Sequence, residues 1–526
     1  MLSVPAFSPY WQLFKLGRGG FLASEQAYHW LDDDLILAVL SQIDGERSSQ
    51  HIAQKLAPEI AVERTYYALM QLAAGGILIE KGDESQIEAS DCQGFREMIS
   101  AATDDLPNST SVIVKGETDL LNKEIEGVLA KCTDCAKGQS GKVILYSTRE
   151  LLSPQLKAAA VEAWNSNHSF LPVKFYGREP IVGPLIAPSK SGCIECLWDR
   201  LSSNMRLKLM LPANYEAPFL HDRALAAWEI VSERLRGPYN GRRSPHTLLQ
   251  WSEREKSWLS HTLIARPHCT LCGNEASWKN DLGLGRFAKR KLTYDTTTLG
   301  HRIVPASRTL RHFSLHDSAL TGTFFYDNTD SGIPDYFGCY ALLNVATPPD
   351  IEHGHNLKAF KSMSAGGKGT NRENALASAF GEAIERFCLI NDDGRPLHQA
   401  RPSELHAFSH VAPSKLINFS NRQYDNREQL NELEDHVNIP ERMPEDPVLK
   451  WWPCWSLTDD KAKLLPAAYV QRSPSLREQD WFSCNSNGMA AGNCCEEALI
   501  QGACELIERD AFGLWWYHMR HSPVLD

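Results

Sequence analysis

A five-residue pattern, E-x-I-E-R, occurs twice in this chain and constrains its fold more than any other feature. The copies span residues 382–386 and 505–509, and each lies in an alanine-rich stretch with helical spacing. A helix places residues three and four apart on one face, so each copy stacks carboxylates that repel one another. A single copy is usually a solvated face with its own Glu–Arg pair. Two copies among apolar neighbours instead indicate that something positive neutralises the carboxylates.

The two predicted helical faces are rich in oxygen ligands. They carry Ser378, Glu382, Glu385, Glu497, Gln501, Glu505 and Glu508. Carboxylate sites suit magnesium, which usually binds together with phosphates, so the pattern predicts a site for magnesium and a nucleotide. Glycine-rich segments, residues 364–369 and 487–492, precede the helices and are predicted to be turns. No complete P-loop motif is present, so phosphates would be held by the carboxylate–magnesium system, Lys368 and helix N-termini.

Composition excludes several classes of protein. The 526 residues, with 43% hydrophobic and 23% charged content, predict a globular protein of two to four domains. The formal charge of −11 argues against a nucleic-acid partner. The N-terminus lacks a signal-peptide pattern and no apolar run could span a bilayer, so we expect a cytoplasmic protein without membrane contact. Its 14 cysteines are then more often metal ligands, catalytic groups or buried thiols than disulfides.

Residues 1–82 are predicted to form a winged helix. Short strands at 11–16, 20–23 and 28–31 precede helices at 35–42, 49–56 and 62–74, and a strand follows at 77–80. This module holds six Lys or Arg residues against nine Asp or Glu residues, a net charge of −3. DNA-binding modules are normally basic. A peptide that adds a strand to the small sheet and contacts the third helix is therefore the favoured partner.

Residues 83–284 are predicted to form a second, Rossmann-like domain that begins with a polar linker at 83–110. A strand at 111–114, a turn at Lys115-Gly116 and a helix at 119–129 indicate α/β character. The turn lacks the G-x-G-x-x-G pattern that lets a backbone approach a pyrophosphate, so this domain is expected to have lost nucleotide binding. A basic segment, residues 286–291, opens the remaining region, residues 285–526.

Three C-x-x-C pairs lie in or near the middle region. Cys193, Cys196, Cys269 and Cys272 could present four thiolates to a structural zinc ion, although about seventy residues separate the two pairs. The third pair, Cys132 and Cys135, lies in a hydrophilic stretch and is as readily a pair of surface thiols as a metal site. His268 is interpreted as an incidental neighbour of Cys269.

Each glycine-rich segment, together with the E-x-I-E-R helix that follows it, resembles one of the two signatures of YcaO-domain proteins. Residues 366–386 resemble the first and residues 486–511 the second. The upstream part is similar to the fused cyclodehydratases that form azoles in ribosomal peptides. In these, a winged-helix leader-peptide recognition element (here 1–82) leads into a degenerate ubiquitin-activating-enzyme-like domain with a four-cysteine zinc site (83–284). The YcaO domain (285–526) follows, and the whole is of the α/β (α+β) class.

The resemblance implies particular site residues. The magnesium carboxylates would be Glu382, Glu385, Glu505 and Glu508. The nucleotide would be lined by Lys368, Ser378, Arg386, Asn493, Glu497 and Arg509. The implied cofactors are ATP, Mg2+ and structural Zn2+. The implied partners are a ribosomal precursor peptide, whose leader binds residues 1–82, and a flavin dehydrogenase of the same pathway; homodimer formation is left open.

The implied reaction is cyclodehydration. A Cys, Ser or Thr side chain of the precursor attacks the preceding carbonyl, ATP phosphorylates the amide oxygen, and phosphate leaves to give an azoline. The chain departs from the family pattern by ending soon after the second signature, without a proline-rich tail. The YcaO domain is therefore expected to be incomplete at its C-terminus, Trp515 and Trp516 are expected to lack packing partners, and no catalytic residue is assigned.

Three alternatives remain open. A non-catalytic scaffold would bind the leader and present the precursor to another enzyme. A related YcaO enzyme would deliver an external nucleophile and form a thioamide or amidine. A transcription regulator built on the winged helix is disfavoured by the acidic charge of residues 1–82.

Overall fold

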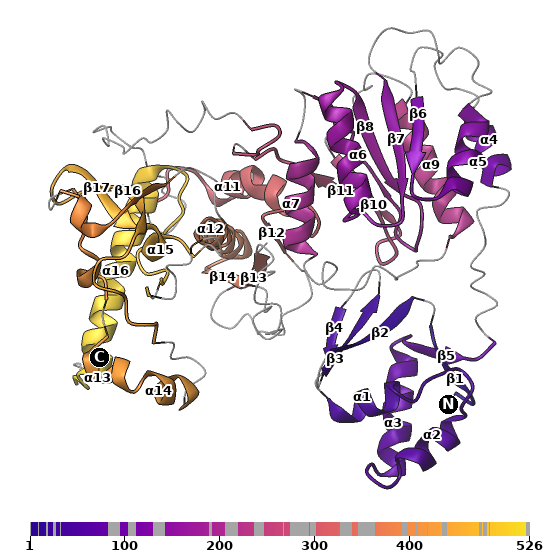
Figure 1. Ribbon diagram of the computed structural model, residues 1–526, viewed down its shortest axis with the longest axis horizontal. Helices are drawn as coiled ribbons and strands as arrows, with labels where there is room; N and C mark the ends of the chain where they lie inside the picture. Colours follow the sequence, from indigo (N-terminus) through magenta and orange to yellow (C-terminus); the bar gives the residue numbers. More distant parts are fainter. Residues whose placement is uncertain are drawn as a thin grey trace. The chain divides into compact units, whose positions relative to one another are not determined.

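Figure 1 shows the elements of the computed structural model. The contacts within the chain define two compact units. Unit 1 comprises Met1–Ile194 and Met205–Leu263, and unit 2 comprises Glu195–Asn204 and Ile264–Asp526. The structure describes residues 2–8, 10–16, 19–24, 28–31, 33–82, 95–103, 112–129, 142–188, 192–205, 219–235, 247–266, 268–273, 294, 301–326, 339–345, 363–391, 397–406, 409–417, 419–433, 439–472, 476, 481–482 and 484–521. Cys132, Cys135 and the basic segment 286–291 lie outside these residues.

The N-terminal part of unit 1 combines three helices with two small antiparallel sheets. The helices are α1 (Asp34–Leu40), α2 (Ser49–Leu56) and α3 (Val62–Ala74), and the strands are β1 (Pro5–Phe7), β2 (Trp11–Leu16), β3 (Gly19–Ser24), β4 (Tyr28–Leu31) and β5 (Leu78–Glu80). Strands β2, β3 and β4 form one sheet, and β1 pairs with β5. Asp33 and Ser48 cap α1 and α2 by accepting hydrogen bonds from backbone N–H groups. Buried apolar side chains from α1, α3, β3 and β5 form their common core.

The second part of unit 1 is a six-stranded sheet of order β11-β10-β9-β8-β7-β6. Its strands are β6 (Val112–Gly116), β7 (Val143–Thr148), β8 (Ser169–Lys174), β9 (Ile181–Val182), β10 (Thr247–Ser252) and β11 (Ser257–Thr262). Strands β6, β7 and β8 are parallel and the other pairings are antiparallel. The helices are α4 (Phe95–Thr103), α5 (Asp119–Leu129), α6 (Pro154–Asn165) and α9 (His221–Leu235). Figure 1 shows α6 and α9 on opposite faces of the sheet.

Two local predictions for this region are wrong. Part of the predicted linker, Phe95–Thr103, is helix α4, and the Phe95 and Ile99 side chains are fully buried in the core. Their spacing of four residues places them on one helical face, which the polar flanking sequence obscured. The predicted turn at Lys115-Gly116 is instead the end of β6. Gly116 is tightly enclosed there, since an added Cβ would lie 2.1 Å from the Ser147 hydroxyl oxygen.

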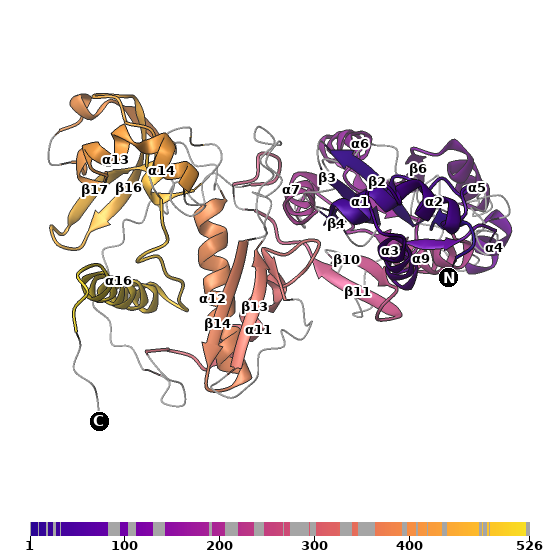
Figure 2. The same ribbon diagram turned by 90° about the horizontal axis from the view of Figure 1, so that it is seen from below.

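In unit 2, a three-stranded antiparallel sheet carries the first signature. Its strands are β12 (Phe324–Phe325), β13 (Cys339–Val345) and β14 (Met363–Gly369), and its helices are α11 (Ala306–Phe313) and α12 (Arg372–Ile390). Figure 2 shows α12 lying along β14 and β13. The predicted glycine turn before α12 is therefore wrong: these glycines lie in strand β14. A Cβ on Gly367 would lie 2.1 Å from the Ala375 carbonyl oxygen, so glycine permits the close approach of strand and helix.

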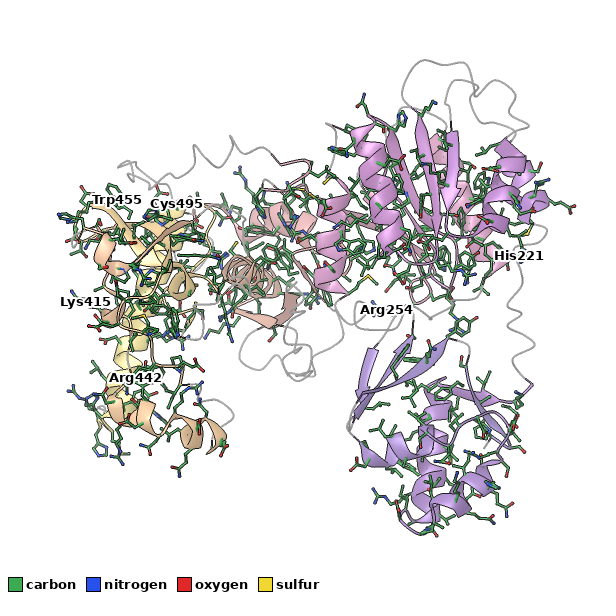
Figure 3. The ribbon with its side chains drawn as sticks, viewed as in Figure 1. His221, Arg254, Lys415, Arg442, Trp455 and Cys495 are labelled. Carbon is green, nitrogen blue, oxygen red and sulfur yellow. The ribbon has the colours of Figure 1, made fainter. Side chains whose placement is uncertain are left out.

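A second sheet, β15-β16-β17, lies between the two signatures in sequence. Its strands are β15 (His398–Ala400), β16 (Leu449–Ser456) and β17 (Lys461–Pro466), with helices α13 (Asn421–Asp425), α14 (Arg427–Leu433) and α15 (Ala467–Val470). Short 3-10 turns occur at Ser314–His316, Pro402–Glu404 and Pro413–Lys415. The side chains of this part, among them Trp455 on β16, are drawn in Figure 3. Trp451 is fully buried in its core and donates a hydrogen bond to the Ala400 carbonyl (2.9 Å).

Helix α16 (Cys495–Tyr517) carries the second signature. Its C-terminal half exposes large apolar side chains: Trp515 is 44% and Trp516 is 59% exposed. The expectation that these two tryptophans lack packing partners is wrong, because the Phe512 ring lies 5.7 Å from the Trp515 ring and 6.0 Å from the Trp516 ring, and the two tryptophan rings lie 5.7 Å apart.

The mixed α/β class predicted for the chain is confirmed. Helix α7 (Ile194–Asn204) contains the first C-x-x-C pair, and most of it belongs to unit 2 by its contacts. The three-domain division at residues 82 and 284 stays a prediction, because the contacts define two units instead. Among the described residues, no helix is long and apolar enough to cross a membrane.

Candidate functional site

A cavity of about 540 Å3 in unit 2 collects side chains from both signatures. This volume lies within the range of pockets that hold small-molecule ligands. Its lining residues come from α11 and the segment before it, from α12, and from α16 and the loop before it. They are His301, Arg302, Thr309, Phe313, Ala377, Ser378, Gly381, Glu382, Glu385, Arg386, Met489, Ala491, Gly492, Asn493, Glu497, Ile500, Gln501, Cys504, Glu505 and Arg509.

The two E-x-I-E-R copies build the same local arrangement. The first glutamate of each copy accepts a hydrogen bond from a backbone N–H of the preceding glycine segment: Gly366 to Glu382 (3.3 Å) and Gly488 to Glu505 (3.2 Å). The same glutamate pairs with the arginine one turn later. The Glu382–Arg386 distance is 3.1 Å and the Glu505–Arg509 distance is 3.3 Å. Each glycine segment and arginine thus fixes one carboxylate at the cavity wall.

Glu385 is the most perturbed carboxyl group of the cavity. Burial raises its pKa to about 7, the Arg386 guanidinium opposes this shift, and the Glu505 and Glu382 carboxylates reinforce it. Three acidic groups from two helices therefore share one partly desolvated space. A cation bound among them would favour the ionised form of all three, as magnesium sites in proteins do. Carboxylate oxygens are ligands that Mg2+ prefers, so the chemistry of this donor set suits Mg2+.

The loop before α16 is held in place by Glu497. The Glu497 carboxylate accepts hydrogen bonds from the Ile303 backbone N–H and from the backbone (2.6 Å) and side-chain (2.9 Å) nitrogens of Asn493. The Thr309 hydroxyl donates to the Asn493 side-chain oxygen (2.9 Å). Three donors already engage Glu497, so its charge positions Asn493 at the cavity wall.

The structure does not bring all the predicted site residues together. Ser378, Arg386, Asn493, Glu497 and Arg509 line the cavity, as do Glu382, Glu385 and Glu505. Lys368 on β14 and Glu508 on α16 are exposed and do not line it. The roles assigned to these residues remain predictions.

The lining residues that sequence reasoning missed include His301, Arg302 and Thr309. These three precede the first signature by about sixty residues or more and carry no motif. Only the hydrogen bonds to the second signature, made by Thr309 and Ile303, reveal that this segment belongs to the site.

The raised pKa of Glu385 predicts a pH-dependent magnesium affinity. A proton competes with the cation for this carboxylate below pH 7, so the affinity for Mg2+ should rise between about pH 6 and pH 8 and level off above. Calorimetric titration of the protein with MgCl2 in the presence of a non-hydrolysable ATP analogue measures this dependence. An affinity that stays constant over this range would contradict the burial of Glu385.

The four predicted zinc ligands lie together. The sulfur atoms of Cys193, Cys196, Cys269 and Cys272 are all within 4.8 Å of one another, and the Cys196 and Cys272 sulfurs are 3.5 Å apart. Tetrahedral Zn–S bonds of about 2.3 Å place sulfurs roughly 3.8 Å apart, so the cluster fits zinc. Three of the four cysteines are buried, which suits a closed structural site. His268 is not part of the group.

Comparisons with known proteins agree with this picture. Residues 366–526 match the family model described as YcaO cyclodehydratase, ATP- and Mg2+-binding. An uncharacterized protein of Methanothermobacter thermautotrophicus is 29% identical over 162 residues, which are 30% of this chain and 36% of that protein. The match therefore spans about a third of the length of that relative.

Two solved structures are similar over the full length of this chain. One is described as a heterocyclase in complex with substrate and cofactor; it has a TM-score of 0.68 and 25% identity, and 72% of its chain is covered. The other, the heterocyclase TruD, has a TM-score of 0.60 and 23% identity, with 72% of its chain covered. The second likeness shows the fold alone.

Proposed function

We propose that this chain, whose residues 366–526 match the YcaO family model, is an ATP-dependent cyclodehydratase of a ribosomal precursor peptide. One observation carries the proposal. Glu382, Glu385 and Glu505, from two different helices, face one cavity of suitable volume, and burial raises the pKa of Glu385 to about 7. Such a site is suited to a cation with phosphates, and the similarity to heterocyclases indicates which reaction uses them.

In the proposed reaction, the peptide loses one water for each ring formed, and ATP is converted to ADP and phosphate. The side-chain sulfur or oxygen of a Cys, Ser or Thr in the precursor attacks the preceding carbonyl carbon and loses its proton. The carbonyl oxygen takes the γ-phosphoryl group of ATP, which releases ADP. The C–O bond then breaks, phosphate leaves, and the amide nitrogen loses its proton to give the C=N bond of an azoline.

The residues of this chain would hold and orient the nucleotide in this reaction. The carboxylates Glu382, Glu385 and Glu505 would hold Mg2+, which neutralises charge on the transferring phosphoryl group. Asn493, fixed by Glu497 and Thr309, presents a side chain at the cavity wall. Arg386 and Arg509 keep two of the carboxylates in place through the ion pairs within each copy.

Mass spectrometry of the cognate precursor after incubation with the protein, ATP and Mg2+ tests this function. We expect the loss of one water per modified residue and none with Glu385→Gln. An unchanged precursor with retained leader binding and no ATP hydrolysis would favour the leader-binding scaffold instead. Consumption of ATP only when sulfide or ammonia is added would favour thioamide or amidine formation.

We further propose that residues 1–82 bind the leader of the precursor. Helix α3 exposes two large side chains one turn apart, Tyr67 (61% exposed) and Met70 (53% exposed). The sheet of β2, β3 and β4 in the same part of the chain ends in two edge strands, each of which could accept a further strand. Anchoring the leader would raise the local concentration of the core peptide at the cavity.

Replacement of Tyr67 tests this leader site. Tyr67→Ala should raise the Kd for a fluorescently labelled leader by about 10-fold, the usual effect of losing one exposed aromatic anchor at an interface. Gln54→Ala, at an exposed position of α2, should leave the Kd unchanged. Equal Kd values for Tyr67→Ala and the unaltered protein would show that the leader binds elsewhere.

A further inference from the structure

Helix α7 belongs to the unit that holds the cavity, although it lies about 160 residues before the first signature. We propose that Arg200 on α7 is a positioning residue of the nucleotide site, and that it acts through Phe387 of α12. The proposal rests on the proposed function, because it assigns a role to the same cavity. None of the cavity-lining residues comes from α7.

The Arg200 side chain is a buried cation, and its guanidinium group contacts the face of an aromatic ring. Its side chain is only 7% exposed, and its guanidinium carbon lies 4.8 Å from the centroid of the Phe387 ring. Among the described residues no carboxylate pairs with Arg200, and its Nη1 atom has no hydrogen-bond partner. Burying a guanidinium in this way is costly unless another interaction offsets the lost solvation. The π face of Phe387 supplies one.

Among the described residues, the charged groups near Arg200 form no ion pair with it. Burial lowers the pKa of Arg200, Asp199 opposes this shift, the nearby Arg266 guanidinium adds to it, and the Cys196 and Cys388 thiols oppose it. Asp199, however, pairs with Arg266 at 2.6 Å. Burial, followed by the charges of Arg200 and His312, lowers the pKa of His316. The cation–π contact with the Phe387 ring is therefore the interaction of the Arg200 guanidinium that the described residues show.

Phe387 is placed to control how α12 faces the cavity. It directly follows Arg386, and its ring packs against the apolar core that also contains Ala379 and Ala383 of the same helix. The rotation of a helix about its axis decides which side chains face a neighbouring cavity. A ring fixed at the end of α12 thus helps to keep Glu382, Glu385 and Arg386 on the cavity side.

Helix α7 is itself held firmly, which a positioning element requires. Near its beginning, the Arg266 backbone N–H donates to the Cys196 sulfur (3.3 Å). At its end, the Asn204 side-chain amide donates to the carbonyls of Leu320 (3.1 Å) and Gly322 (3.0 Å). This loop leads into β12, where the Phe324 ring lies 4.8 Å from that of Phe380 on α12. Helix α7 thus contacts α12 directly, through Arg200 and Phe387. It is also linked to α12 indirectly, through Asn204, the loop before β12 and the Phe324–Phe380 ring contact.

A double-mutant cycle on nucleotide affinity tests the proposal in the full-length protein. The probe is a non-hydrolysable ATP analogue with Mg2+, titrated calorimetrically. Arg200→Met should raise its Kd roughly 3- to 20-fold, the range that one desolvated cation–π contact can support. Phe387→Leu should raise the Kd by a similar factor. The Kd of the double variant should not exceed the larger of the two single-variant Kd values. Arg200→Lys, which keeps the cation, should recover part of the affinity.

The controls separate positioning from general destabilisation. Arg422→Met, at an exposed arginine of α13, should bind the analogue normally. The Arg200 and Phe387 variants should raise the KM for ATP while leaving the KM for the precursor and the affinity for the leader unchanged. If Arg200→Met does not fold, Phe387→Leu and Phe387→Tyr carry the test, because Tyr keeps the aromatic face and should bind normally.

The possible results distinguish a failure of the role proposed for Arg200 from a failure of the proposed function. Multiplicative losses in the double variant, or normal binding by both single variants, would overturn the role of Arg200. Absence of analogue binding in the unaltered protein would instead contradict the proposed function of the cavity.

Discussion

Glu385→Gln should lower ATP hydrolysis and ring formation by roughly 100-fold or more, as expected when a carboxylate that holds a catalytic cation is lost. The same change should make the metal-free protein more stable at pH 8. The pKa of Glu385 in the folded protein is raised to about 7 from the ordinary value of 4.5. The folded state therefore holds this proton more tightly than the unfolded state, and stability falls as the pH rises from about 4.5 to 7. The neutral glutamine removes that cost.

Thermal unfolding with and without Mg2+ and nucleotide checks both halves of this prediction. The unaltered protein should gain Tm on addition of the ligands, because they bind only the folded state, whereas Glu385→Gln should not. Glu373→Gln is the matched control, since Glu373 lies exposed in the first turn of the same helix. A lower Tm for Glu385→Gln at pH 8 without ligands would show that its charge is already compensated within the protein.

Cys269→Ser should remove bound zinc and strongly destabilise the protein. Cys269 is only 5% exposed and its sulfur lies among three other thiol groups, so loss of the ion would leave the remaining thiols without the bonds that join them. Structural zinc sites contribute folding free energy directly, and we expect the Tm to fall by roughly 10 °C or more. Elemental analysis should find about one zinc per unaltered chain and none in the variant.

Cys495→Ser provides the control for this change. Cys495, labelled in Figure 3, is an exposed free cysteine at the start of α16 and belongs to no metal-ligand group among the described residues. Its replacement should change neither the zinc content nor the Tm. A Cys269→Ser protein with normal Tm and zinc content would show that the four thiols are a packing cluster.

Much of the local structure followed from the sequence. The helices predicted at residues 49–56, 62–74 and 119–129 have these bounds in the structure, because their apolar periodicity and flanking turn residues agree. Ser48 caps α2 as its position before an apolar helix predicted. Helix α4 was missed because only its two buried residues, Phe95 and Ile99, distinguish it from the polar sequence on either side.

The glycine-rich approach to α12 shows where local reasoning fails. Residues 366–369 look like a turn, because glycine is common in turns, yet they form strand β14. Glycine is required at these positions because the strand packs closely against α12. This contact is tertiary, and no local sequence pattern reveals it. In the same way, Thr309 and Ile303 join the site through hydrogen bonds to residues more than 180 positions away.

The sequence by itself determined part of the candidate site, namely the carboxylates of the two E-x-I-E-R helices and the four clustered thiols. Helical spacing places Glu382 and Glu385 on one face, and the paired C-x-x-C motifs identify four thiols, because both patterns depend only on local backbone geometry. Only the tertiary structure decided which charged side chains lie close to one another. It brings Glu385 close to Glu505 from another helix, leaves Glu508 exposed and sets Arg200 against Phe387. Burial and the distances between elements set those interactions, and both arise only when the helices pack together.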